Sequence, residues 1–144
     1  MPTSTSSVLP QTTSYDEFQT LVKEICIELW EDPNTACFGR AGQKQNGIDV
    51  YGQPKDAGGK YRGVQCKLRT YSGKISETEI KKEVKAAKSF GHEIDQLIIF
   101  TNVPRDTKLQ LFIDKLNQAE SKKNRFITLL WFLDDLDQLI SLFA

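Results

Sequence analysis

The segment DQLIIFTN, residues 95–102, restricts the fold of this 144-residue chain more than any other feature. Its centre has four successive apolar residues, without the alternation of apolar and polar side chains that marks a strand with one face in water. Such a strand belongs in the middle of a sheet that is covered on both faces. The chain is long enough to bury this core as one domain. The segment therefore predicts a sheet between two layers of helices.

The beginnings of two helices are marked by capping boxes. Ser14 is followed three residues later by Glu17, and Ser76 is followed in the same way by Glu79. Apolar residues recur at helical spacing after each box. Gly91 ends the second helix, which is amphipathic and basic. The predicted helices cover about residues 14–30, 77–90, 106–118 (introduced by Pro104) and 134–143.

The predicted strands complete an α/β fold class. IDVYG and YRGVQCKLR flank a turn that contains Pro and Gly, and form a hairpin. The predicted strands cover residues 48–52, 61–69, 95–102 and 125–133, with a short additional strand at 36–39. Their order among the helices predicts a central mixed sheet of four to five strands with helices on its faces.

Charge is distributed unevenly along the chain, although its net value is zero. Between Arg40 and Lys88 there are twelve Lys and Arg residues against five Asp and Glu, a net charge of +7. The three cysteines are an odd number without a CxxC spacing, and one histidine does not complete a zinc site. The cysteines favour a reduced, cytoplasmic setting, and no segment has the length or composition of a membrane span or secretory signal.

Two neighbouring strands carry polar residues that can meet. In the strand over 61–69, Gln65 and Lys67 share one face, with Arg69, and Val64, Cys66 and Leu68 share the other. Asp49 lies in the preceding strand, where aspartate is disfavoured. Taken singly, a strand lysine is usually solvated and an aspartate beside glycine is usually a turn residue. Together they can surround one ligand.

A carboxylate with one or two further oxygen ligands suits a hard divalent cation, above all Mg²⁺, for which Mn²⁺ can substitute. The first helix offers a second acid at Glu24 or Glu28. A metal at this position would lower the pKa of a bound water and take up charge on a phosphoryl oxygen. Lys67 would orient or deprotonate that water and stabilise the transition state. This chemistry cleaves a phosphodiester.

GIDVYG followed by GVQCK resembles the PD-(D/E)xK nuclease superfamily, and most closely its Mrr-like restriction branch, in which Gln-x-Lys replaces acid-x-Lys. The likeness runs from about Tyr15 to the end of the chain. It implies a restriction-endonuclease-like three-layer α/β/α fold. By resemblance the catalytic and metal-binding residues are Asp49, Gln65, Lys67, the backbone carbonyl of Cys66, and Glu24, with Glu28 as its alternative. Because Gln65 is neutral, weaker metal binding is expected than with two acids.

The resemblance also implies an activity and a context. We expect a Mg²⁺-dependent endonuclease that hydrolyses DNA, most readily double-stranded, with little sequence specificity. Similar domains are effectors at the N-termini of bacterial antiviral NTPases and restriction systems. A homo-oligomer is therefore expected, with regulatory or sensor domains in a longer protein. Residues 1–13 are expected to be a disordered leader to the nuclease domain at 14–144.

Basic and polar residues around this site are candidates for contact with DNA. A lysine-rich helix face can bind phosphates, and each such contact weakens as salt rises. The same residues can instead be solvated loop and helix positions. The candidates are Arg40, Gln43, Lys44, Gln45, Arg69, Lys81 and Lys85.

Three alternatives remain open at this stage. The domain can be a catalytically silent DNA-binding or assembly module on the same fold, or a junction-resolving nuclease. It can also be an α/β domain of unrelated function. Dependence on metal, and on Asp49 and Lys67, separates the nucleases from the other two.

Overall fold

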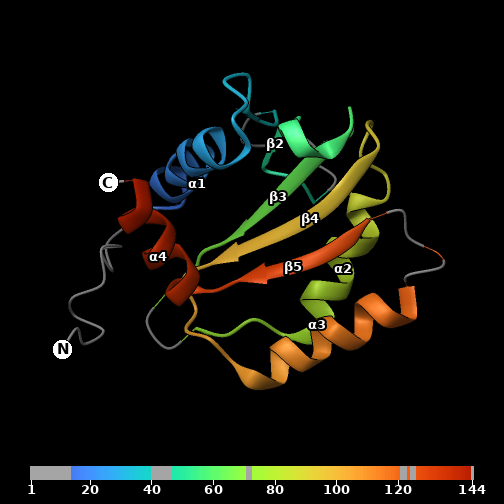
Figure 1. Cartoon of the computed structure of the whole chain (residues 1–144). Coiled ribbons are helices and arrows are strands. Elements are labelled where there is room, and N and C mark those ends of the chain that lie inside the picture. The colour runs from blue at the N-terminus through green and yellow to red at the C-terminus, as the bar shows by residue number, and fades with distance from the viewer. Residues whose placement is uncertain (1–13, 40–46, 71–72, 121–122, 124–125, 144) are drawn as a thin grey trace.

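The computed structural model describes residues 14–39, 47–70, 73–120, 123 and 126–143. In these ranges four α-helices and one five-stranded sheet form an α/β domain (Figure 1). The elements are α1 (Tyr15–Trp30), β1 (Ala36–Cys37), β2 (Val50–Gly52), the short 3₁₀ helix η2 (Lys55–Ala57), β3 (Tyr61–Lys67), α2 (Glu77–Ala87), β4 (Ile94–Thr101), α3 (Thr107–Glu120), β5 (Ile127–Trp131) and α4 (Leu133–Phe143). None of these helices is long and apolar enough to cross a membrane. The predicted leader, 1–13, lies outside the described residues.

The sheet has the strand order β1-β2-β3-β4-β5. β1, β2 and β3 pair antiparallel, whereas β3, β4 and β5 pair parallel. Each parallel pair is connected through a helix, α2 between β3 and β4 and α3 between β4 and β5. The predicted mixed sheet of four to five strands is confirmed.

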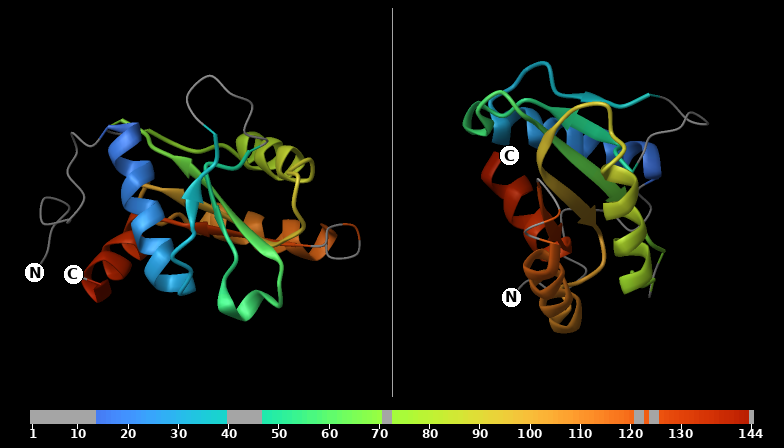
Figure 2. Two further views of the ribbon diagram at one scale, coloured as in Figure 1. Left: turned by 90° about the horizontal axis from the view of Figure 1, so that it is seen from above. Right: turned by 90° about the vertical axis from the view of Figure 1, so that its right-hand side faces the viewer.

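Helices cover both faces of the sheet. Figure 2 shows α1 and α4 on one side and α2 and α3 on the other. Two separate cores result, and β4 contributes to both: Ile98 and Phe100 pack with α1 and α4, while Leu97 and Ile99 pack with α2 and α3. The uninterrupted apolar run of β4 is thus explained, because both sets of alternating side chains are buried.

Both predicted capping boxes are present, at Ser14 and at Ser76. The predicted end of α2 was three residues too long, because the helix stops at Ala87 instead of Phe90. The backbone N–H groups of Ser89 and Phe90 donate to carbonyls three residues back, at 3.0 and 3.1 Å. This tighter turn brings Phe90 into the core, where it is buried.

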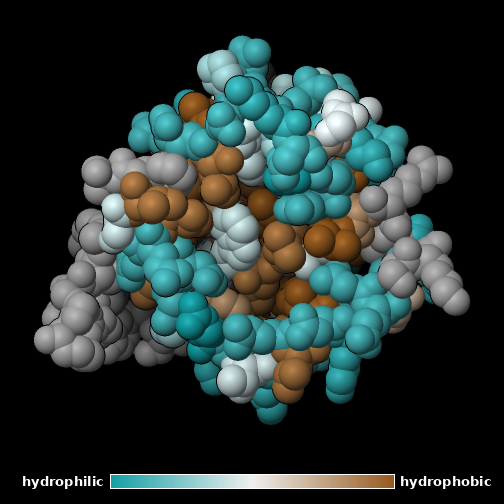
Figure 3. All heavy atoms as spheres, viewed as in Figure 1, coloured by the Kyte–Doolittle hydropathy of each residue, from teal (hydrophilic) through white to brown (hydrophobic). Residues whose placement is uncertain are grey.

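β5 is the edge strand on the side viewed in Figure 3, where hydrophobic side chains gather in the middle of the face and hydrophilic ones surround them. The side-chain amide of Asn117, on α3, hydrogen-bonds the outward-facing backbone groups of Thr128 in this strand. It donates to the carbonyl of Thr128 at 2.8 Å and accepts from its N–H at 2.9 Å. Asn117 therefore closes the edge to another strand at that residue.

β2 and β3 separate where a regular hairpin would continue to pair. Their pairing runs from Gly52↔Arg62 to Val50↔Val64, whereas β3 continues to Lys67. Sequence analysis started the first strand at Ile48, so the prediction that Asp49 lies inside a strand was wrong. Asp49 instead lies immediately before β2, at the fork between the two strands.

Candidate active site

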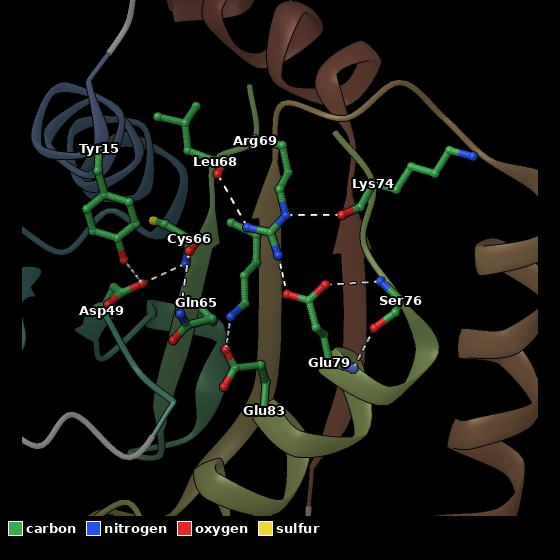
Figure 4. A network of polar contacts seen from close by, with 11 residues as sticks. Tyr15, Asp49, Gln65, Cys66, Leu68, Arg69, Lys74, Ser76, Glu79 and Glu83 are labelled. Carbon is green, nitrogen blue, oxygen red and sulfur yellow. Dashed lines mark hydrogen bonds and ion pairs between the residues drawn. The ribbon is translucent and has the colours of Figure 1, made fainter. Parts of the chain in front are cut away.

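Asp49 is the buried acid of the fork, with only 1% of its surface exposed. Its Oδ2 accepts hydrogen bonds from the hydroxyl of Tyr15 at 2.6 Å and from the backbone N–H of Cys66 at 2.8 Å (Figure 4). Its backbone carbonyl accepts from Nε2 of Gln19 at 3.2 Å. Both hydrogen bonds that described residues make to the carboxylate fall on Oδ2, which leaves Oδ1 for a further ligand.

The separation of the strands explains why an acid suits this position. The N–H of Cys66 has no partner on β2, since pairing between the strands stops at Val64. A buried N–H without an acceptor would destabilise the fold. The carboxylate of Asp49 accepts this hydrogen bond where a strand backbone would otherwise do so.

The electrostatic environment opposes ionisation of Asp49. Burial raises the pKa of this carboxyl above its ordinary value, and the hydrogen bonds from Tyr15 and Cys66 offset only part of the effect. The negative charge of Glu83 raises this pKa further, while Lys67 lowers it. Burial, followed by the hydrogen bond to Asp49, also raises the pKa of the Tyr15 hydroxyl, which therefore remains a donor. A cation near Oδ1 would stabilise the ionised carboxylate.

Gln65 and the carbonyl of Cys66 lie beside each other at the fork. Nε2 of Gln65 is 3.4 Å from the Cys66 carbonyl oxygen. The nitrogen and oxygen of a glutamine amide are assigned from hydrogen bonding, so the amide oxygen can take the nitrogen's position. The two oxygens would then be close to the ~3 Å that separates neighbouring ligands of an octahedral Mg²⁺. These residues fit the predicted ligand set.

Lys67 points to the other face of β3 from Cys66, as the strand alternation predicted. Val64 and Cys66 are buried against α1, and Lys67 forms an ion pair with Glu83 of α2. Two residues further along, Arg69 forms a second ion pair, with Glu79 of α2. The side chains of Lys67 and Glu83 are 18% and 11% exposed, so solvent screens this pair little.

Sequence analysis missed Glu83, although its spacing carried a signal. Ile80, Val84 and Ala87 are the buried apolar residues of α2, and position 83 shares their face because it is three residues after the first and four before the last. An acid inside such a stripe needs a partner, since burial of an unpaired charge is unfavourable. Lys67 is that partner.

The structure does not bring the predicted helix acids to Asp49. Glu24 and Glu28 are exposed on α1, and Glu24 borders a surface hollow with Asp16 and Thr20. Tyr15 and Gln19 are the α1 residues that contact Asp49. At 3.6 residues per turn, Glu24 lies about 140° and Glu28 about 180° around the helix from Gln19. Their assignment as ligands was therefore wrong for the arrangement observed.

The predicted DNA-binding residues fall into three groups. Arg40, Gln43, Lys44 and Gln45 lie outside the described residues. Lys81 and Lys85 are exposed on α2, and the amine of Lys81 lies 5.8 Å from the ring centroid of Phe112. Arg69 is half-buried and held from several directions, because its side chain donates to the Lys74 carbonyl at 3.0 Å while Asn102 bonds its backbone on both sides at 2.7 Å. Neighbouring residues therefore hold Arg69 in place, and its contact with DNA stays a prediction.

Within the described ranges, no three His, Cys, Asp or Glu side chains form a metal-binding group. The predicted set does not require one, because it combines the carboxylate of Asp49 with an amide and a backbone carbonyl oxygen, the donors that Mg²⁺ accepts. Comparison of the chain with protein-family models, curated proteins and solved structures found no match.

Proposed function

We propose that this chain is a metal-dependent endonuclease domain of restriction-endonuclease-like fold that hydrolyses DNA. The observation that carries the proposal is the arrangement around one fork of a buried acid, an amide beside a backbone carbonyl, and a lysine: Asp49, Gln65, Cys66 and Lys67. The fold supports it, since these residues lie where β2 and β3 separate in a mixed sheet with helices on both faces.

Each residue has a role in this proposal. Oδ1 of Asp49, the amide oxygen of Gln65 and the carbonyl of Cys66 would hold Mg²⁺ or Mn²⁺. When bound, the metal would activate water and stabilise charge on the phosphoryl group. Lys67 would orient the attacking water and offset the negative charge that develops on the phosphate oxygens. Exposed lysines of α2, among them Lys81 and Lys85, would attract the DNA backbone.

The biological context belongs to the same proposal. By the resemblance of GIDVYG and GVQCK to Mrr-like nucleases, the domain would serve as an effector of bacterial defence or restriction. Its cleavage would then depend on oligomerisation and on regulatory domains. Double-strand cleavage needs two cuts, so bringing two copies together should raise activity.

The test is cleavage of supercoiled plasmid at low salt with Mn²⁺ or Mg²⁺. Wild type, Asp49→Asn and Lys67→Met would be compared, each alone and fused to a dimerising helix. Wild type should nick in a metal-dependent manner, Lys67→Met should be at least about 10²-fold slower, and Asp49→Asn should fall to background. Lys108→Met is the matched control, because Lys108 is an exposed lysine on α3.

The competing function is a catalytically silent binding module, and one observation favours it. Lys67 is paired with Glu83, and Oδ2 of Asp49 is occupied by Tyr15 and Cys66, as in a polar network that serves stability alone. A silent module would bind DNA without Mn²⁺. If wild type, even when dimerised, cuts linear, branched and single-stranded DNA and RNA no faster than Asp49→Asn, the nuclease proposal is wrong.

A further inference from the structure

Glu83 lies next to the candidate site, although sequence analysis did not assign it there. It is on the inner face of α2, is 8% exposed, and its carboxylate contacts the ammonium of Lys67. Figure 4 shows its side chain reaching from α2 toward β3, on the side where Gln65 and Asp49 lie. Burial raises the pKa of Asp49 most, and the negative charge of Glu83 raises it further. The pKa of Tyr15 is raised by burial, by the hydrogen bond to Asp49, by the charges of Asp49 and Cys66, and last by Glu83.

The charges at the fork show what Glu83 contributes. Asp49 is the acid of the ligand set, Gln65 is neutral and Lys67 carries a positive charge. These three alone would sum to zero, and a divalent cation would have to bind beside an uncompensated ammonium group. With Glu83 included the sum is negative, which favours a cation in a site poorly screened by water.

The surrounding contacts hold Glu83 in this position. Arg69, two residues after the end of β3, and Glu79 of α2 form the next ion pair. Glu79 also closes the capping box at Ser76, and Asn102 fixes the backbone of Arg69. The α2 helix is thus anchored at its first turn, and Glu83, one turn later, faces Lys67.

We propose that Glu83 is a positioning residue: it holds the ammonium group of Lys67 beside Asp49 and offsets its charge, so that a site with only one carboxylate ligand can bind a divalent cation. This inference rests on the proposed metal-dependent function. Glu83 acts through Lys67 and is not itself assigned as a ligand.

Mn²⁺ binding to the folded protein is the primary measurement, by calorimetry or by the loss of the free-ion electron paramagnetic resonance signal. Glu83→Gln keeps the size of the side chain and removes its charge. It should weaken Mn²⁺ binding about 10- to 100-fold, the usual effect of losing a group that supports a metal ligand. Glu83→Asp keeps the charge and should recover part of the affinity. In plasmid cleavage, Glu83→Gln should lower kcat at saturating Mn²⁺ and leave the KM for DNA nearly unchanged.

Asp95→Asn is the matched control, because it breaks another ion pair of β3, with Arg62, at the opposite end of the strand. It should lower stability without changing Mn²⁺ affinity or kcat. The inference is overturned if wild type binds Mn²⁺ and Glu83→Gln binds it equally well, or if Asp95→Asn weakens binding as much. The two failures are distinct: wild type that neither binds Mn²⁺ nor cuts DNA contradicts the proposed function itself, whatever Glu83 does.

Discussion

A buried ionisable side chain lies at each end of β3, and the two have different surroundings. At the start of the strand, Arg62 donates to both carboxylate oxygens of Asp95, at 2.9 and 2.5 Å, and lies 3.4 Å from Asp56. Burial alone would lower the pKa of Arg62, but these acids outweigh it and raise the pKa. Near the end of the strand, the hydrogen bonds that described residues donate to the carboxylate of Asp49 come from neutral groups, the Tyr15 hydroxyl and the Cys66 backbone N–H.

The contrast separates Arg62, whose charge stabilises the fold, from Asp49, whose ionisation the surroundings oppose. The charge of Arg62 is matched by opposite charges in direct contact. Burial leaves the pKa of Asp49 raised, and Lys67, whose charge lowers this pKa, is itself paired with Glu83. Ionisable groups held in unfavourable surroundings are concentrated at functional sites, because ligands and substrates complete their environment.

The largest expected difference between the two ends is in stability. Asp95→Asn should lower the free energy of unfolding by about 3 kcal/mol, since it leaves Arg62 buried with Asp56 as its remaining charged partner. Asp49→Asn should change it by less than about 1 kcal/mol, because the amide oxygen can still accept from Tyr15 and Cys66. Urea unfolding in metal-free buffer measures both. A larger loss for Asp49→Asn would mean that its charge serves the fold.

Much of the fold could be predicted because local patterns determine it. The apolar run of β4 predicted a sheet covered on both faces, and the boxes at Ser14 and Ser76 predicted where helices begin. The shared face of Gln65 and Lys67, opposite to Val64 and Cys66, followed from strand alternation. Each of these predictions depends on interactions between residues that are close in the sequence.

The rest of the site depends on how elements pack. Periodicity identified the apolar face of α1 but not which flank of that face lies beside Asp49, and this decides whether Gln19 or Glu24 contacts the acid. Likewise, the hairpin was predicted without the divergence of β2 from β3, so the backbone N–H of Cys66 was not recognised as a donor to Asp49. Only Glu83 had a usable signal, its place within the apolar stripe of α2.

The hydroxyl of Tyr15 offers a smaller test of the Asp49 end. Tyr15→Phe removes one of two donors to Oδ2 and keeps most of the ring packing, so unfolding should become easier by about 1 kcal/mol. If the hydrogen bond to Oδ2 also orients the carboxylate so that Oδ1 can bind the cation, Tyr15→Phe should weaken Mn²⁺ binding a few-fold. Tyr51→Phe is the control: its ring packs against Phe38 and Tyr61, and no described residue bonds its hydroxyl. Equal effects of the two substitutions would show that the hydrogen bond to Asp49 contributes nothing.

The smallest expected effect is the pH dependence of stability. The contributions of Asp49 and Glu79 to stability should change in opposite directions with pH. The pKa of Asp49 is raised from its ordinary 3.8, so the folded state binds this proton more tightly than the unfolded state. The stability that Asp49 contributes is fully present below pH 3.8 and is lost as pH rises through the raised pKa. Asp49→Asn should therefore gain stability relative to wild type over that interval, and the difference should level off above it.

Glu79 should behave in the opposite way. Burial opposes its ionisation, but the backbone N–H of Ser76 and the guanidinium of Arg69 outweigh burial and lower its pKa from 4.5. The stability from Glu79 is present above pH 4.5 and is lost as pH falls through the lowered pKa, so Glu79→Gln should lose its disadvantage in acid. Urea unfolding of the three proteins from pH 3 to 7 measures both trends. Saturating Mn²⁺ should abolish the trend of Asp49 alone if the cation binds this carboxylate, and it should leave both trends unchanged if the fork is only structural.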